Sequence, residues 1–203
     1  HNKLGTQGDR VERVRAIARA IGQQLGGDVL AQKADQAAQL AKTDLVTDMV
    51  GEFPELQGTM GRYYALNDGL SADVADAIED HYKPRFAGDE LPRNDVGIVV
   101  ALADKLETLV GMFGIGNVPT GDKDPFALRR HALGVIRMLG EKNLALDLQT
   151  LFEKAFAVFP TEISMYPAEN IKLLLAFIYD RFSGSLREQG YSAQEVDAVV
   201  SQR

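Results

Sequence analysis

Apolar residues recur every three or four positions along nearly the whole chain, which is the spacing of one face of an α-helix. In the first such segment Val14, Ile17, Ile21 and Leu25 share a face, and Gly26-Gly27 ends it. No stretch alternates apolar and polar residues for long enough to form a β-strand. The pattern therefore predicts an all-α fold.

Turn and capping residues divide the first half of the chain into further predicted helices. An alanine-rich stretch from Val29 to Val50 is expected to be helical, with an interruption near Lys42. Ser71 is expected to cap a helix, because its side chain can accept a hydrogen bond from a free backbone amide of the first turn. Pro84 cannot continue that helix, so it should end there.

The second half shows the same organisation. Asn94 is expected to cap a helix over 95–113, and Asp124-Pro125 to open another, as a cap followed by proline at the first helical position. Two prolines flank the irregular stretch 159–167, so we expect a helical bundle over 1–158 and C-terminal helices of a following module over 159–203. The later helices are predicted at 143–157, 167–189 and 192–202, the last with a capping box from Ser192 to Glu195.

Composition narrows the class of protein. The 203 residues are 45% hydrophobic, carry a net charge of -7 and include no cysteine. A mixed, acidic balance argues against a protein that wraps duplex DNA or binds membranes through a polybasic surface. The absence of cysteine excludes disulfides and thiolate zinc sites, and it fits a cytoplasmic location. No apolar run approaches the roughly 20 residues of a membrane span. Because the chain starts without methionine and ends after a helix-like pattern, we expect a piece of a longer protein.

The predicted helix 95–113 carries an unusual polar residue. One face is plainly apolar, whereas the opposite face is a stripe of small residues that would let a second helix approach closely. A buried, unpaired carboxylate is costly, so Asp104 should have a partner: a metal ion, a basic side chain such as Arg62, or backbone amides. On these residues alone a satisfied aspartate that orients two helices is favoured. The stripe consists of Gly97, Ala101, Asp104, Thr108 and Gly111.

Other chemical motifs fail when they are inspected closely. The loop from Gly116 to Gly121 is similar to a phosphate-binding P-loop, but Asp122 precedes Lys123 and no strand precedes the loop. His81 and His131 have no second histidine three or four residues away, so no helical zinc pair exists. We expect His81 to interact with a helix C-terminus and His131 to belong to a basic surface. No catalytic residue is predicted.

Basic residues form the remaining candidates for a binding surface. Two clusters, on either side of Phe86 and after Pro125, could contact a polyanion, although neighbouring acidic residues make a solvated face the favoured interpretation from charge alone. Arg62 precedes Tyr63-Tyr64, an arrangement that can also stack on nucleic-acid bases. The candidates are Arg62, Lys83, Arg85, Arg93, Lys123, Arg129, Arg130 and Arg137.

Several long stretches together resemble the beta subunit of the tetrameric bacterial glycyl-tRNA synthetase. The similarity spans most of residues 3 to 140 and recurs weakly from Tyr179. Runs of this length and order are far more specific than a short motif. The stretches are KLGTQGDRVERV from Lys3, KTDLVTDMVGEFPELQGTMGRYYA from Lys42, HYKPRFAGDELP from His81, VVALADKLETLVGMFGIGNVPTGDKDPFALRRHALGVIRML from Val99 and YDRFSGSLREQGYSAQEVDAV from Tyr179.

The resemblance implies a function and partners. In that family the alpha subunit activates glycine with ATP and Mg, while the beta subunit supports the binding of glycine tRNA and the alpha2beta2 assembly. The chain would then be a cytoplasmic fragment with tRNA-binding and scaffolding roles and no cofactor of its own, and it should not aminoacylate tRNA alone. Contact with membrane or DNA is not expected. An alternative is a module that only binds the alpha subunit.

The resemblance also implies an HD-like helical domain, which connects two parts of the sequence. In hydrolases of the HD superfamily a late helix carries Ala-Asp-Arg/Lys-Leu, and residues 103–106 look like it. An earlier helix carries His-Asp, where this chain has threonine before Asp48. Without imidazoles a binuclear metal site that activates water is not supported. Asp48 and Asp104 are therefore interpreted as vestigial positions, and a residual metal-dependent phosphohydrolase is the other alternative.

Overall fold

The structure is a computed structural model that describes residues 1–201, and every regular element within that range is helical. The only bridge between extended residues there is an isolated one, from Thr120 to Lys123. The prediction of an all-α fold is confirmed, whereas the HD-like topology stays a prediction. The elements are α1 (Gln7–Leu40), η1 (Thr43–Val46), α2 (Asp48–Glu52), η2 (Pro54–Leu56), α3 (Thr59–Asn67), α4 (Ala72–Asp80), α5 (Asp95–Gly114), α6 (Leu128–Glu141), α7 (Leu148–Phe156), α8 (Pro167–Glu188) and α9 (Ala193–Val200).

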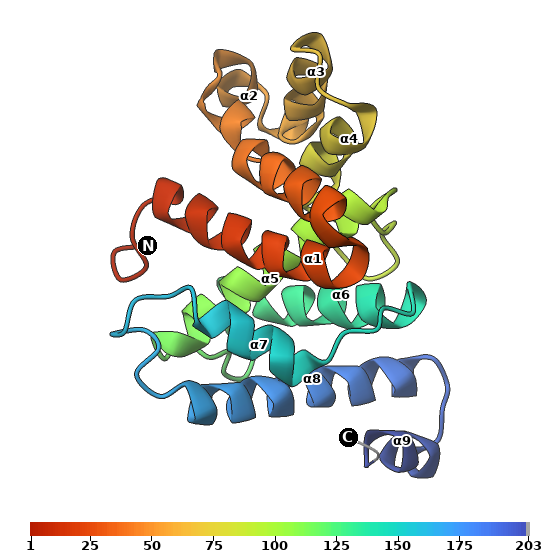
Figure 1. Ribbon diagram of the computed structural model, residues 1–203. Coiled ribbons are helices and arrows are strands. Elements are labelled where there is room, and N and C mark those ends of the chain that lie inside the picture. Colours follow the sequence, from red (N-terminus) through yellow and green to blue (C-terminus); the bar gives the residue numbers. More distant parts are fainter. Residues whose placement is uncertain (202–203) are drawn as a thin grey trace.

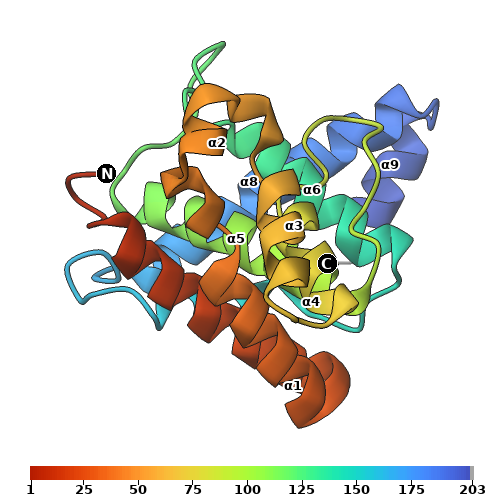
Figure 2. The same ribbon diagram turned by 90° about the horizontal axis from the view of Figure 1, so that it is seen from above.

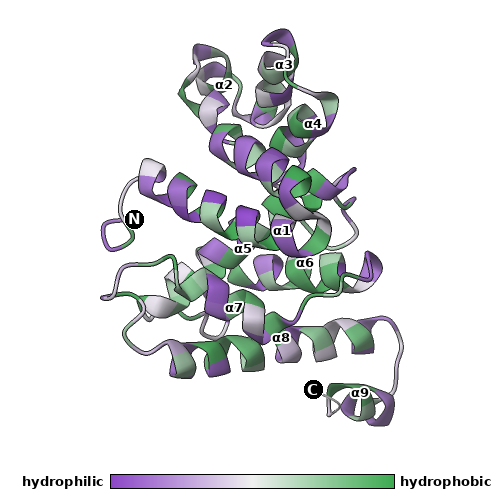
Figure 3. Ribbon diagram, viewed as in Figure 1, coloured by the Kyte–Doolittle hydropathy of each residue, from purple (hydrophilic) through white to green (hydrophobic). Residues whose placement is uncertain are grey.

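Helix α5 is the centre of the bundle. Nearly all of its residues are buried, and α1, α4, α6, α7 and α8 all pack against it (Figure 1). Its ribbon is accordingly mostly hydrophobic, whereas α1 shows many polar residues (Figure 3). An apolar helix surrounded on all sides needs no polar face. Any polar side chain on α5 must therefore find its partner inside the protein.

Helix α1 is two helices joined at a kink. Gly26 and Gly27 have non-helical backbone angles, and Gly27 has the positive φ of 67° that glycine adopts at low cost. The predicted stop at this pair is confirmed, and Figure 2 shows the kinked end projecting from the body. The second half ends at Leu40, so the expected helix from Val29 to Val50 is interrupted close to Lys42, as predicted.

The starts of two later helices test the capping predictions. Asn94 caps α5 as expected, since its side chain accepts a hydrogen bond from the amide of Gly97. Ser71 occupies the N-cap position of α4, but its hydroxyl donates to Asp73 and does not cap the backbone. Helix α6 begins at Leu128, later than the expected start at Pro125.

Asp124 nevertheless satisfies the free amides at the start of α6. Its carboxylate accepts hydrogen bonds from the amides of Leu128 (2.8 Å) and Arg129 (2.9 Å). A carboxylate at this end of a helix is stabilised by the helix dipole. The acidic cap was predicted correctly, and the intervening turn, in which Ala127 has a positive φ of 54°, displaces the helix start.

Helices α8 and α9 lie close to their predicted ranges, whereas α7 begins at Leu148, later than the predicted start at 143. The capping box from Ser192 to Glu195 is present, and the predicted end at residue 202 lies outside the described residues. Ile171, Leu174 and Ile178 of α8 belong to the same hydrophobic core as α5. The boundary between 158 and 159 stays a prediction. Among the described residues no helix has the length and apolarity of a membrane span.

Candidate functional site

Asp104 lies in the middle of α5 and is only 6% exposed. Its Oδ1 is 3.0 Å from Nη2 of Arg10 and 3.2 Å from Nζ of Lys42. The prediction that this carboxylate needs a partner is confirmed, and the partners are two cations of the segment 10–42. Arg62, the basic partner suggested from sequence, pairs instead with Asp76 at 2.6 Å.

A second buried carboxylate extends this ion cluster one turn along α5. Glu107 accepts a hydrogen bond from Nε of Arg10 at 2.8 Å and lies 2.8 Å from Nη2 of Arg13. The hydroxyl of Thr108 accepts from Nη2 of Arg10 at 2.9 Å. Charge-assisted hydrogen bonds of this kind compensate part of the cost of removing the charges from water. The polar face of α5 therefore fixes α1 against it.

The same cations determine the protonation of Asp104. Burial alone would raise the pKa of its carboxyl, but the Lys42 and Arg10 cations beside it hold that pKa far below its usual range. Burial lowers the pKa of Lys42, and Asp104 offsets part of that effect. We therefore treat Asp104 as a carboxylate whose charge is already compensated by protein side chains.

His81 is fully buried at the end of α4 and touches the cluster. Its Nδ1 is 2.6 Å from the carbonyl oxygen of Ile78, and its Nε2 is 2.8 Å from Nζ of Lys42. Burial first, and then the Lys42 cation, lowers the pKa of His81 to about 3. The ring is neutral, so it donates to the last turn of the helix and accepts from Lys42. The expected interaction of His81 with a helix C-terminus is confirmed, and it is made by a neutral ring.

Asp48, the other position predicted to be vestigial, does not reach this cluster. Asp48 is exposed at the first residue of α2 and forms no ion pair within residues 1–201. Thr47 caps α2, because its hydroxyl accepts from the amide of Val50. The buried carboxylate of this segment is Asp44, whose Oδ2 accepts from the amide of Gly58 at 2.6 Å. Threonine is thus explained here by a local capping role.

A cavity of about 440 Å³ opens beside the ion cluster, between the first half of α1, the middle of α5 and the start of α6. His131 lines it and is only partly accessible, so its assignment to a basic surface is wrong. Burial, with a smaller contribution from Lys105, lowers the pKa of His131 to about 4, so its ring is neutral. The cavity is lined by His1, Leu4, Gly5, Thr6, Gln7, Arg10, Arg13, Lys42, Tyr82, Asp104, Glu107, Thr108, Met112, Phe126 and His131.

The donor set around Asp104 does not fit the metal centre of an HD hydrolase. No group of three histidine, aspartate or glutamate side chains that could hold a metal ion occurs among residues 1–201. The two nearest cations, Arg10 and Lys42, already occupy Oδ1 of Asp104. A site that activates water needs several neutral or anionic ligands around one ion. We derive no metal-dependent step at this position.

Five of the eight basic candidates are neutralised by nearby acids. Lys83 and Arg93 both pair with the buried Asp80, at 3.1 Å and 2.8 Å. Arg85 pairs with Asp89 at 3.1 Å. Such pairs cancel most of the field that a polyanion would sense. The neutralised candidates are Arg62, Lys83, Arg85, Arg93 and Arg137, the last of which pairs with Glu141.

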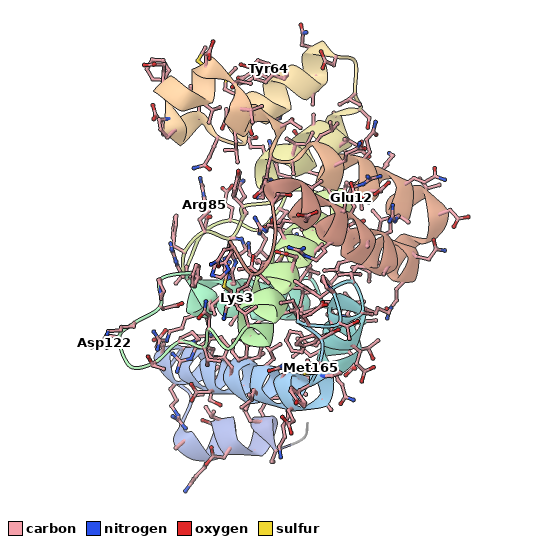
Figure 4. The ribbon with its side chains drawn as sticks, turned by 90° about the vertical axis from the view of Figure 1, so that its left-hand side faces the viewer. Lys3, Glu12, Tyr64, Arg85, Asp122 and Met165 are labelled. Carbon is pink, nitrogen blue, oxygen red and sulfur yellow. The ribbon has the colours of Figure 1, made fainter. Side chains whose placement is uncertain are left out.

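The other three candidates gather at the start of α6. Lys123, Arg129 and Arg130 form no ion pair within residues 1–201, and Arg129 donates to the carbonyl oxygen of Gly121 in the preceding loop. Asp122 adds a negative charge at the outer end of this loop (Figure 4). We call Lys123, Arg129 and Arg130 the basic segment.

Comparison with known proteins shows to which family the chain belongs. The sequence profile described as Glycyl-tRNA synthetase beta subunit matches residues 1–201. The chain belongs to this family. Relatives named glycine–tRNA ligase beta subunit are 76% identical over 203 residues in Paracidovorax citrulli and 74% identical over 203 residues in Delftia acidovorans. Each alignment covers all of this chain but only 28% of the relative, so the chain spans a little over a quarter of their length.

The sequence did not reveal Arg10, Lys42 and His81 as a connected group in this member of the glycyl-tRNA synthetase beta subunit family. All three lie inside stretches that carry the family resemblance. Their location in these stretches was the only sequence feature that set them apart. No local pattern in the sequence connects Arg10 to a carboxylate 94 residues away.

Proposed function

We propose that this chain contributes tRNA contact and subunit scaffolding to a glycine–tRNA ligase and performs no chemistry of its own. The observation that supports the tRNA contact is the basic segment, whose cations have no carboxylate partner among the described residues. Free cations attract phosphates, because each neutralised phosphate releases counterions. Within the whole enzyme, glycine activation with ATP and Mg belongs to the alpha subunit, and the enzyme acts in the cytoplasm.

The acidic net charge limits the affinity of the isolated chain for RNA. At -7 the molecule as a whole repels a polyanion, so binding must depend on a local field. The capping role of Asp124 helps, because its carboxylate is engaged by the amides of Leu128 and Arg129. The expected affinity is weak and sensitive to salt.

The test is tRNA binding by the assembled enzyme as a function of salt concentration. Replacing Arg129 and Arg130 by glutamine should reduce the slope of log affinity against log salt by roughly two, one for each lost phosphate contact. The matched control replaces Arg85 and Arg93, which are exposed but paired with acids. An unchanged slope in the first variant, or an equal loss in the control, would show that the basic segment is not the tRNA contact.

A second surface supports the scaffolding role. Several large apolar side chains are exposed on the segment that links α1 to α4, and Val46 is 89% exposed. Large apolar side chains that are exposed together on one segment suit a protein interface. This segment forms one end of the molecule, where Tyr64 lies (Figure 4). We call the following residues the apolar patch: Leu45, Val46, Met49, Phe53, Tyr63, Tyr64 and Leu66.

The charge around the apolar patch favours a protein partner over RNA. Asp48, Glu52 and Glu55 are exposed on the same segment, and Arg62 is neutralised by Asp76. Carboxylates repel phosphates and suit a partner with an apolar surface and a basic rim. We assign this partner to the alpha subunit.

Association of the two subunits tests the assignment. Val46→Asp should weaken subunit association at least about tenfold, because a buried, unpaired charge would be placed at the interface. Val29→Asp is the matched control, since Val29 is also exposed, at 67%, but lies on α1. Equal affinities for wild type and Val46→Asp in sedimentation or calorimetry would remove the apolar patch from the interface.

A further inference from the structure

We propose that the cavity beside Asp104 binds a small phosphate ester of mononucleotide size, held by cationic side chains without a metal ion. The site differs from the basic segment and from the apolar patch, so the inference does not rest on the proposed function. Its volume, about 440 Å³, lies in the range of roughly 300–1,000 Å³ that small-molecule pockets occupy.

The charges that line the cavity leave a surplus of one cation. Arg10, Arg13 and Lys42 are positive, whereas Asp104 and Glu107 are negative. Three positive charges against two leave one positive charge uncompensated by the lining. Inside a cavity with low-dielectric walls that surplus acts more strongly than at the surface. The chemistry therefore selects an anion over a cation.

Some donors of the lining residues form no hydrogen bond within the protein. Arg10 makes its contacts through Nε and Nη2, and its Nη1 forms no hydrogen bond within residues 1–201. Lys42 contacts His81 and Asp104, and its Nζ lies 4.5 Å from the centre of the Tyr82 ring, so its contribution to the cavity is its positive charge. The ring of His131 lines the cavity and forms no hydrogen bond to a described residue. Phosphate oxygens accept charge-assisted hydrogen bonds from such groups.

The lining of the cavity also includes apolar side chains, which bear on the size of the ligand. Met112 and Phe126 line the cavity, and the ring centroid of Phe126 lies 6.1 Å from that of His1 in an edge-on arrangement. Inorganic phosphate would leave these apolar side chains uncovered. A nucleotide would place its phosphate at Arg10 and Lys42 and its base against Phe126, which matches the common combination of an apolar pocket with few polar groups.

Calorimetric titration of the full chain in the presence of EDTA tests the proposal. AMP should bind with a Kd below about 1 mM, inorganic phosphate more weakly, and adenosine without measurable heat. A short RNA with a 5′ phosphate separates two sources of the same chemistry. Tighter binding than AMP identifies an RNA end as the natural ligand, and weaker binding identifies a free nucleotide. No saturable AMP binding, or equal binding of adenosine, would overturn the proposal.

Two variants connect binding to the named residues. His131→Leu removes a side chain without a hydrogen-bond partner among residues 1–201, so the fold should persist while AMP affinity falls at least about tenfold. Lys42→Met should have a similar effect on affinity. Its matched control is Lys33→Met, which removes a lysine of α1 that pairs with Asp73 outside the cavity. Affinity unchanged in His131→Leu, or lowered equally by Lys33→Met, would contradict the assignment.

Discussion

Two groups of basic side chains in this protein have opposite roles although their residue types are the same. Arg10, Arg13 and Lys42 lie inside the molecule and share two buried carboxylates of α5. The basic segment lies at the start of α6 and has no carboxylate partner among the described residues. The first group holds two helices together and supplies the positive charge of the proposed small-anion cavity, whereas the second is available to a polyanion at the surface. Partners and burial, not the number of basic residues, separate the two groups.

The difference is energetic. Buried ions lose their hydration, so each depends on its partner, and removing one partner leaves an uncompensated charge. Exposed cations keep their hydration and add little to stability. Substitutions in the interior group should therefore change the free energy of unfolding, whereas those in the basic segment should change only binding.

The largest expected effect separates Asp104 from Asp48, the two aspartates predicted to be vestigial. Asp104→Ala leaves Arg10 and Lys42 without their shared carboxylate and should lower the free energy of unfolding by about 3 kcal/mol or more. Asp48→Ala, at an exposed position, should change it by less than about 0.5 kcal/mol. Denaturant titration of both variants measures the difference. Similar stabilities would show that the ion cluster is not essential to the packing of α1 on α5.

The pH dependence of stability tests the interior in a second way. His131 is neutral in the fold, with its pKa lowered to about 4 by burial, whereas in an unfolded chain its pKa is about 6.5. Above pH 6.5 it adds no pH dependence. As pH falls from there toward 4, the unfolded chain takes up a proton that the folded chain does not, and stability falls by about 1.4 kcal/mol per pH unit.

A variant isolates this contribution. Relative to His131→Gln, which does not titrate, the wild-type protein should lose about 2 kcal/mol between pH 7 and pH 5. Denaturant unfolding curves of both proteins at the two pH values measure this change in the free energy of unfolding. If both proteins respond equally to pH, the imidazole is not buried in solution, and the cavity beside it is open to water.

Local patterns in the sequence were sufficient for most of the fold. Helical periodicity predicted α5, the Gly26-Gly27 kink follows from glycine's backbone freedom, and Asn94 and Ser192 act as caps because capping depends on the next three residues. Helix α3 was missed, since its nine residues have little apolar periodicity. The start of α6 was misplaced because the Asp124 side chain caps across a turn.

The candidate site could be predicted only in part. The sequence indicated correctly that Asp104 is buried and needs a partner, because its helix is apolar on the opposite face. The identity of that partner depends on how α1 packs on α5, which brings Arg10 next to a residue 94 positions later. The spacing of residues along the sequence does not predict which side chain of α1 will contact Asp104. The roles of the eight basic candidates required the same knowledge of distant carboxylates.

A smaller effect concerns the interior surroundings of the cluster. The hydroxyl of Tyr82 is buried and has no hydrogen-bond partner within residues 1–201. Tyr82→Phe removes an unsatisfied polar group, so stability should stay unchanged or rise by up to about 1 kcal/mol. Tyr64→Phe, at a side chain that is 38% exposed, is the matched control and should have no effect. A clear loss of stability in Tyr82→Phe would show that the hydroxyl has a partner in solution, such as a water molecule.

The smallest expected effect tests whether a surface cation must lack a carboxylate partner in order to bind RNA. Lys123→Gln removes one unpaired, exposed cation and should reduce the salt slope of tRNA binding by roughly one, with no change in stability. Arg137→Gln removes a cation of α6 that is paired with Glu141 at 2.7 Å, and it should leave the slope unchanged. If both variants reduce the slope equally, the Arg137–Glu141 pair opens when RNA binds. The cations available to tRNA would then extend along α6, and a carboxylate partner would no longer distinguish scaffolding charges from binding charges at the surface.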